Sequence, residues 1–361
     1  MPYAAGLHLV PPHLAAPREP LTPALPAASA RRAQPSAKPR PRTRDLKSLA
    51  AFAQGARMSY PGDVRQALTG PVASVSTPFN RDGSVDRGGL RRYIDFVIAG
   101  GSHAVMLTYG DSLYSALTDE EVGQVTSLVA EHTAGRALVV AADRQWATPK
   151  EVAFARFARE AGADVLMVLP PDWALSCTRD TLIDHYAAVA GEIPVMVVTN
   201  YLIYRPMPFG LELLDALCDR VPGVVAVKDD VCGEFARKMG ASLHGRTTLI
   251  SGGQKQNHMN ALPYGCNGYL STFIKFKPSV ARDYWQAVQS KDYDRATAII
   301  TTYDVPFFDF IHALPGGFDA GLHGTLELFG VAQRWRPKPY HSLSDAELER
   351  LAAFLTEKAL L

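Results

Sequence analysis

Short apolar runs alternate with amphipathic stretches from about residue 70 to residue 290. The apolar runs are rich in β-branched residues, which is typical of strands that are buried on both faces. The stretches between them carry apolar residues three and four positions apart, as helices with one buried face do. The predicted strands are Val72–Thr77, Ala104–Thr108, Ala137–Ala142, Val165–Leu169, Val195–Thr199, Val224–Val227, Thr248–Ser251 and Gly268–Thr272.

One predicted helix follows each of these strands, and several helices carry start signals. Thr118 precedes three acidic residues, and Thr148 precedes a proline, which suits the first turn of a helix. The predicted helices are Leu90–Ile98, Thr118–Glu131, Pro149–Ala161, Asp180–Ala190, Phe209–Arg220, Gly233–Leu243, Gln256–Tyr264 and Pro278–Gln289.

This alternation over about 220 residues has the size of a (β/α)8 TIM barrel, an α/β fold. A doubly wound open sheet is the alternative that alternation alone leaves open. We assign the barrel to residues 58–290 and additional C-terminal helices to residues 291–361. The extra helices are expected to pack on the barrel, and they are Tyr293–Ala313, Gly321–Leu328 and Asp345–Leu360.

Residues 1–57 have a different composition. They hold ten prolines, nine Lys or Arg and two Asp or Glu, with no helical or strand period. Such a segment cannot bury enough apolar surface to fold, so we predict a disordered extension or a translation start at Met58. The pair Arg31-Arg32 is not followed by an apolar segment, so an export signal is not favoured, and an organellar transit peptide ranks behind disorder.

The balance of charge and the cysteine spacing exclude several classes of protein. The 361 residues carry 37 basic and 36 acidic side chains, which gives no sign of a nucleic-acid or membrane partner. No apolar run approaches the roughly 20 residues that span a bilayer. The four cysteines form no CxxC pair, so we expect reduced thiols in a cytoplasmic protein, without a structural zinc ion.

The apolar run Val224–Val227 leads directly into Lys228. In a (β/α)8 barrel the active site lies at the carboxyl ends of the strands. Burial there disfavours the charged form of an amine, and a neutral amine forms Schiff bases with carbonyl substrates. A surface lysine that closes an ordinary strand is the alternative, and the surrounding residues decide between the two.

Polar residues gather at the other strand ends, whereas the strand interiors are apolar. Neither a metal-binding cluster nor a phosphate-binding glycine loop follows a strand. The simplest chemistry is an imine between Lys228 and a 2-oxo acid, formed without metal or cofactor. The imine acts as an electron sink for carbon–carbon cleavage, carbon–carbon formation or loss of water.

Several motifs together resemble the dihydrodipicolinate synthase/N-acetylneuraminate lyase superfamily of class I aldolases. Their order and spacing extend over about 290 residues, so the resemblance implies the TIM barrel. It also implies a Schiff base on Lys228, a small 2-oxo acid substrate, and a homotetramer or homodimer. The motifs are Ser76-Thr77-Pro78-Phe79, Leu117–Glu121, Ala161–Asp164, Leu169-Pro170-Pro171, Val224–Lys228, Ser251-Gly252-Gly253, Gly265–Gly268 and Leu343–Glu347.

The chain departs from this family where the family keeps its proton relay. The usual Gly-Thr-Thr-Gly-Glu is replaced by Thr108–Ser112, and the relay tyrosine of strand five by Thr199 or Val198, depending on the alignment. Asp172 and Trp173 stand where the family has paired tyrosines. A lyase other than a true dihydrodipicolinate synthase is therefore predicted, either an aldolase or a dehydratase. A non-catalytic barrel kept as a ligand-binding or assembly scaffold is the alternative.

The predicted roles are as follows. Lys228 is catalytic, and Thr199 and Tyr201 are candidates for the missing proton donor, together with Asp111, Asp143 and Asp229. For Asp229 and Asp230, capping of the next helix is the favoured interpretation. Arg144 is expected to form a surface ion pair, and the predicted substrate-binding residues are Tyr109, Gly110, Asp111, Ser112, Arg205, Gly252, Gly253 and Ser271.

Overall fold

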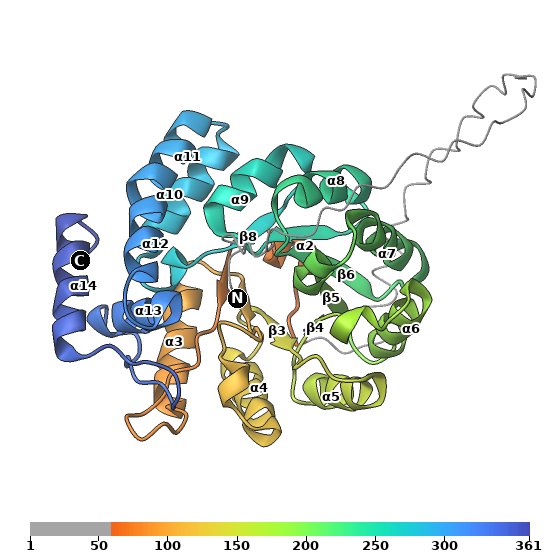
Figure 1. Cartoon of the computed structure of the whole chain (residues 1–361), viewed down its shortest axis with the longest axis horizontal. Coiled ribbons are helices and arrows are strands. Elements are labelled where there is room, and N and C mark those ends of the chain that lie inside the picture. The colour runs from red at the N-terminus through yellow and green to blue at the C-terminus, as the bar shows by residue number, and fades with distance from the viewer. Residues whose placement is uncertain (1–58) are drawn as a thin grey trace, which may run out of the picture. The chain divides into compact units, whose positions relative to one another are not determined.

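The computed structural model describes residues 59–361, in which the strands close into one parallel barrel (Figure 1). β1 pairs with β2 on one side and with β8 on the other, and this closure rules out the open sheet. The (β/α)8 prediction is confirmed, while the extension predicted for residues 1–57 lies outside the described residues. The strands are β1 Gly70–Ser74, β2 Ala104–Met106, β3 Leu138–Ala142, β4 Val165–Val168, β5 Val195–Val198, β6 Val224–Asp229, β7 Thr248–Ser251 and β8 Gly268–Leu270.

Helices surround the barrel, and the sequence sets where several of them begin (Figure 1). At the start of α4 the hydroxyl of Thr118 accepts the amide of Glu121, whose carboxylate accepts the amide of Thr118 in return. This capping box satisfies two amides that lack partners inside the helix. The helices of this part are α2 Val64–Ala67, α3 Arg87–Ala99, α4 Asp119–Thr133, α5 Thr148–Glu160, α6 Arg179–Ala190, α7 Met207–Arg220, α8 Gly233–Leu243, α9 Gln254–Ala261 and α10 Pro278–Gln289.

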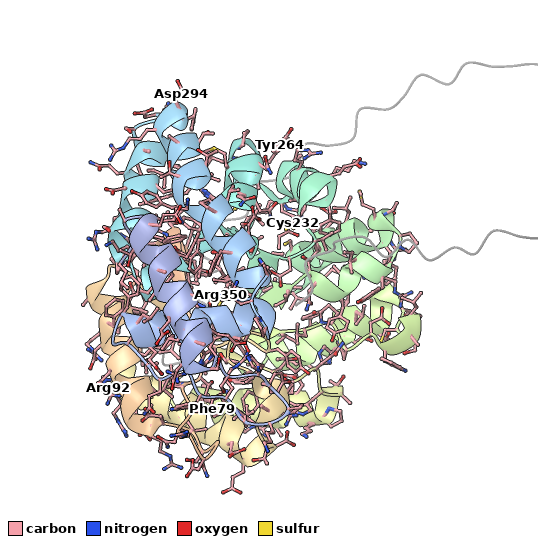
Figure 2. The ribbon with its side chains drawn as sticks, turned by 60° about the vertical axis from the view of Figure 1, so that its left-hand side comes forward. Phe79, Arg92, Cys232, Tyr264, Asp294 and Arg350 are labelled. Atoms are coloured by element: carbon pink, nitrogen blue, oxygen red, sulfur yellow. The ribbon has the colours of Figure 1, made fainter. Side chains whose placement is uncertain are left out.

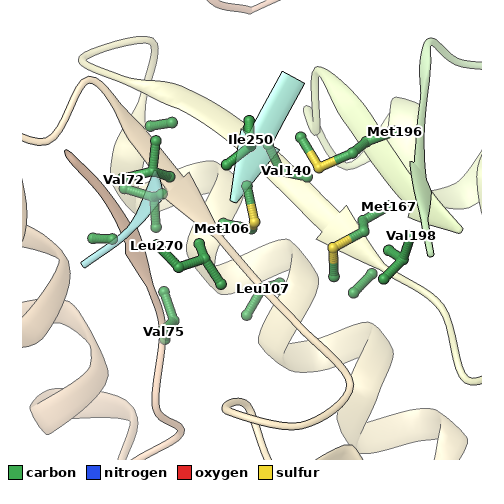
Figure 3. Packing of buried hydrophobic residues seen from close by; sticks show 14 of the residues in the cluster. Val72, Val75, Met106, Leu107, Val140, Met167, Met196, Val198, Ile250 and Leu270 are labelled. Atoms are coloured by element: carbon green, nitrogen blue, oxygen red, sulfur yellow. The ribbon is translucent and has the colours of Figure 1, made fainter. Parts of the chain in front are cut away.

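Apolar side chains fill the interior of the barrel (Figure 3). Met106, Met167 and Met196 come from three strands, and the flexible thioether side chain suits an irregular interior. Val140 and Ile250 are completely buried in the same cluster. Because this layer is dry and closely packed, polar chemistry is confined to the ends of the strands.

The C-terminal helices share a core with the end of the barrel. Phe307 packs its ring 5.2 Å from Phe273, which lies just after β8, and Phe310 stacks on Phe354 at 4.0 Å. Figure 2 shows this side of the molecule, with Arg350 marking α14. The predicted helix over residues 293–313 is interrupted by a π-helical turn, η6. The helix predicted at Gly321–Leu328 begins four residues earlier, at Gly317. The elements are α11 Tyr293–Ile299, η6 Ile300–Asp304, α12 Val305–His312, α13 Gly317–Leu328 and α14 Asp345–Glu357.

A buried ion pair fastens this extension to the barrel. The amine of Lys255, on α9, lies 2.7 Å from the carboxylate of Asp304, and neither side chain is exposed. The amine also lies 4.2 Å from the centre of the Phe273 ring. Among the described residues, no helix is long and apolar enough to cross a membrane.

Candidate active site

Lys228 is buried at the carboxyl end of β6, with 5% of its surface exposed. The strand is longer than predicted, so Lys228 lies within it and pairs in register with Val198 of β5 and Ile250 of β7. Its amine lies 2.6 Å from each carboxylate oxygen of Asp230. The lysine is therefore held at the mouth of the barrel by a carboxylate two residues further along the chain.

Gly252, just after β7, makes room for this pair. A Cβ atom at position 252 would lie 1.7 Å from Oδ1 of Asp230 and 3.0 Å from Nζ of Lys228. The amide of Gly252 donates to the carbonyl of Asp229 at 2.8 Å, which fixes the approach of the two strands. Gly253 has a packing role as well, because a Cβ there would lie 2.7 Å from Cβ of Asn257. Both glycines are places where the backbone comes unusually close to side chains.

Thr199 and Asp229 hold the chain that carries Asp230. The Thr199 hydroxyl donates to Asp229 at 2.9 Å and accepts the amide of Asp230 at 2.9 Å. The Asp229 carboxylate also accepts the amides of Val231 and Cys232, just before α8 begins. Burial raises the pKa of Asp229 to about 6, while the hydrogen bond from Thr199 opposes that rise.

The capping interpretation is wrong for both aspartates, because the N-cap residue of α8 is Cys232. Asp229 accepts the amides of Val231 and Cys232, which precede the helix. The carboxylate of Asp230 faces Lys228 instead. β6 ends at Asp229, so Asp230 lies just beyond the strand, where its carboxylate contacts the amine of Lys228.

Asp111 lies in the turn after β2 and is paired with a second buried lysine. Lys275 donates to Asp111 at 2.9 Å, and the hydroxyl of Ser74, at the end of β1, donates to the same oxygen. Burial would raise the pKa of Asp111, but the charge of Lys275 and these hydrogen bonds lower it to about 2. The charge of Lys228 acts in the same direction, so both pairs lie at one mouth of the barrel.

The sequence prediction missed Lys275, Ser74 and the partnership of Asp230. Lys275 lies in η5 Phe273–Lys275, directly after the last strand, and 1% of its side chain is exposed. A lysine in an apolar segment beside a predicted strand end could have indicated a second buried amine at the mouth. Ser74 carried no comparable signal, because serines are common at strand ends.

Several predicted binding residues are engaged within the protein. The Ser112 hydroxyl donates to the carbonyl of Val75 at 2.7 Å and accepts the amide of Thr108. The carbonyl of Gly110 accepts the amide of Leu113 in the same turn. Ser271, after β8, is completely buried, and its amide donates to Val72 of β1. These residues shape the mouth of the barrel through their backbone positions.

Arg205 makes a bidentate ion pair with Asp172. Its Nε lies 2.6 Å from one carboxylate oxygen and its Nη2 lies 2.8 Å from the other. The guanidinium also donates to the carbonyl of Cys177 and lies 4.3 Å from the centre of the Phe209 ring. Arg205 thus joins the turns after β4 and β5. Arg144 forms an ion pair with the partly exposed Asp119, 2.8 Å away, as expected.

Tyr201, after β5, interacts with Tyr109, which follows β2. Burial raises the pKa of Tyr201, with contributions from Tyr109 and Asp143, so these groups are neighbours. Asp143 follows β3 and accepts the amide of Leu169. The buried carboxyl of Glu151 lies beside it, and burial raises the pKa of both groups, so the pair retains a proton. Within residues 59–361, no cluster of three or more His, Cys, Asp or Glu could hold a metal ion.

Two named relatives are similar to this chain over most of its length. A probable 5-dehydro-4-deoxyglucarate dehydratase from Bradyrhizobium diazoefficiens is 26% identical over 304 residues, which cover 82% of this chain and 94% of that protein. A 4-hydroxy-tetrahydrodipicolinate synthase from Methylococcus capsulatus is 29% identical over 264 residues, which cover 71% of this chain and 88% of that protein.

Solved structures show the same fold at lower identity. N-acetylneuraminate lyase from Mycoplasma synoviae superposes with a TM-score of 0.70 at 17% identity, over 82% of this chain and 99% of that one. A prophage protein of the dihydrodipicolinic acid synthase family from E. coli K12, solved in complex with pyruvate, gives 0.68 at 22% identity, over 81% and 99%. The model of the dihydrodipicolinate synthetase family matches residues 67–358. This chain therefore belongs to the dihydrodipicolinate synthetase family.

Proposed function

We propose that this protein is a lyase that acts on a 2-oxo acid through a Schiff base on Lys228. The observation that carries the proposal is the burial of this amine at the carboxyl end of β6, where (β/α)8 enzymes place their chemistry. Membership of the family and the names of its relatives support the same chemistry.

The proposed reaction begins when the amine of Lys228 attacks the 2-oxo carbon and water leaves. The iminium that results withdraws electrons from the neighbouring carbon, so a proton or a carbon substituent there can depart. Loss of a β-hydroxyl makes the protein a dehydratase, and cleavage of a carbon–carbon bond makes it an aldolase. Pyruvate and sugar-derived keto acids are the proposed substrates, supported by the pyruvate complex and by the names of the relatives.

The remaining site residues are proposed in supporting roles. Tyr201, in η3 Asn200–Tyr204, is proposed to bind the substrate, whereas Thr199 acts by fixing the backbone of Asp230. The turn after β2, Gly252, Gly253, Arg205 and Ser271 form the proposed walls around the substrate. True dihydrodipicolinate synthase activity is not proposed, because the relay threonines and tyrosine of that enzyme are replaced.

We also propose a homo-oligomer, a tetramer or a dimer. Large apolar side chains are exposed on two neighbouring turns at the mouth, among them Trp173, which is 84% exposed. The ion pair between Arg205 and Asp172 joins these turns. Exposed apolar patches of this kind mark contact surfaces. A cytoplasmic location is proposed as well, since all four cysteines are free thiols.

Borohydride trapping tests the proposed function. The protein is incubated with pyruvate and a set of longer 2-oxo acids, reduced, and mapped by peptide mass spectrometry. We expect an adduct on the peptide that contains Lys228, and none in Lys228→Ala. Lys238→Ala is the matched control, because Lys238 is an exposed lysine of α8 paired with Glu234. Absence of an adduct with every acid, from protein with a native circular dichroism spectrum, would favour the scaffold.

A further inference from the structure

We propose that Asp230 is the acid/base group of this site, the residue that replaces the missing relay tyrosine. This proposal rests on the proposed function, because it assigns the proton transfers that imine formation on Lys228 requires. Nothing in the family resemblance assigned Asp230 a chemical role, and the sequence favoured a structural one. The contacts of four carboxylates at the mouth carry the assignment.

Asp230 is the carboxylate that touches the reacting amine. Both of its oxygens lie 2.6 Å from Nζ of Lys228, and 17% of its side chain remains exposed, so it faces both the amine and the mouth. A general base must lie within hydrogen-bond reach of the proton that it removes, and this contact meets that condition. The backbone of Asp230 is fixed by Thr199, and the space for its side chain is left by Gly252.

The other carboxylates at the mouth are committed elsewhere. Asp111 stays ionised, with its pKa lowered to about 2, and its Oδ2 receives hydrogen bonds from Lys275 and Ser74. Such a group cannot donate a proton near neutral pH. Asp229 uses both oxygens to hold Thr199 and two backbone amides. Asp143 accepts the amide of Leu169 and lies beside the buried carboxyl of Glu151.

The proton transfers balance with Asp230 as the only acid/base group. Its carboxylate first takes a proton from the Lys228 ammonium, and the neutral amine attacks the 2-oxo carbon. Asp230 gives this proton to the oxyanion, then takes one from the nitrogen, which leaves a neutral carbinolamine. It returns that proton to the hydroxyl, which departs as water while the nitrogen lone pair forms the iminium. The net change is ammonium plus ketone to iminium plus water.

Asp230→Asn is the first test, because it keeps the shape of the side chain and removes the base. The rate of adduct formation with saturating pyruvate is measured by borohydride quenching between pH 5 and pH 9. We expect a fall of about 100-fold or more, the usual size of a general acid/base contribution, with the adduct still on Lys228. Asp215→Asn is the matched control, because Asp215 also pairs with a cation, Arg246, but lies on α7.

The pH profile separates acid/base action from a simple charge effect. If Asp230 only held the ammonium form, Asp230→Asn would favour the neutral amine, so the adduct would form at least as fast as in the wild type up to pH 9. We expect the deficit to persist there, because no acid remains to protonate the departing hydroxyl. Recovery at pH 9, or a rate within tenfold of the wild type at pH 7, would overturn the assignment.

Asp230→Gly supplies a second test through chemical rescue. Added formate can enter the space that the side chain leaves and act as a carboxylate, so we expect the rate to rise with formate concentration. The wild type and Asp215→Asn should not respond. A variant that forms adduct slowly and does not respond to formate would point to a structural role. If the wild type forms no adduct at all, the proposed function fails first, which distinguishes the two failures.

Discussion

At the scale of single residues, the two buried lysines at the mouth differ in what they can do. Lys275 faces Asp111, whose pKa is held at about 2, so that pair remains ionic over the working range of pH. Lys228, near the end of β6, faces Asp230, whose carboxylate hydrogen-bonds to no other side chain among the described residues. A fixed ion pair suits the walls of a site, whereas a carboxylate with one partner suits proton exchange.

Gly252→Ala tests whether the position of Asp230 matters. The added methyl group would collide with Oδ1 of Asp230 and contact the amine of Lys228, so the carboxylate must move. We expect the rate of adduct formation to fall by about tenfold to 100-fold, within the range of a lost acid/base contact. Thermal unfolding should show that the fold is kept.

Gly88→Ala controls for that substitution. Gly88 lies on α3, and a Cβ there would meet its nearest neighbours at 3.5 Å, an ordinary contact distance. In a helix, alanine is favoured over glycine, so this variant should be as stable as the wild type or more so. Wild-type trapping rates in Gly252→Ala would show that the clash is absorbed without displacing Asp230.

At the scale of elements, one hydroxyl joins the end of β5 to the segment between β6 and α8. Thr199→Val keeps the shape of the side chain but leaves the amide of Asp230 and the carboxylate of Asp229 without this partner. Buried groups left unpaired typically cost about 1–3 kcal/mol. We expect that loss in the free energy of unfolding from urea titration, together with slower adduct formation.

Thr199→Ser is the matched variant, because it keeps the hydroxyl and removes only a methyl group. It should form the adduct nearly as fast as the wild type. If Thr199→Val and Thr199→Ser had equal stability and equal rates, the hydroxyl would have no role in holding this segment. A direct role of Thr199 on the substrate would instead appear as a lower rate without a loss of stability.

The sequence predicted the helices and strands better than the side-chain contacts between them. Strand runs, the capping box at Thr118 and the lysine after Val227 are local patterns, so periodicity and spacing revealed them. Strand alternation could not predict the Lys228–Asp230 contact, because β6 ends at Asp229 and Asp230 lies beyond it. The contact between Asp111 and Lys275 joins residues 164 positions apart, and only barrel closure brings them together.

At the scale of the whole molecule, many polar groups are buried outside the proposed chemistry. Lys255 and Asp304 hold the C-terminal helices, and the carboxyls of Asp143 and Glu151 are buried together beside β3. Because closure of the barrel buries these groups, folding and protonation are coupled. The stability of the molecule must therefore depend on pH, with a sign that each buried group determines.

The buried carboxyls of Asp143 and Glu151 predict how the stability of the protein changes above neutral pH. Burial raises the pKa of Asp143 and Glu151 above their ordinary values near 4, so the folded protein keeps protons that the unfolded chain releases. The stability that this pair contributes is fully present below the pKa values of the unfolded chain. It is lost as pH rises through the raised pKa values of the folded protein. Buried histidines such as His258, with a pKa lowered to about 4, act on the acid side instead.

Glu151→Gln removes the ionisable carboxyl of Glu151 and keeps a polar side chain of the same shape. From pH 7 to pH 9 we expect the urea midpoint of the wild type to fall more steeply than that of Glu151→Gln. Groups common to both proteins cancel in the difference. Glu349→Gln, on the exposed face of α14, should follow the wild type. Parallel slopes in all three proteins would mean that Glu151 is ionised in the folded state, and that the proton near β3 resides elsewhere.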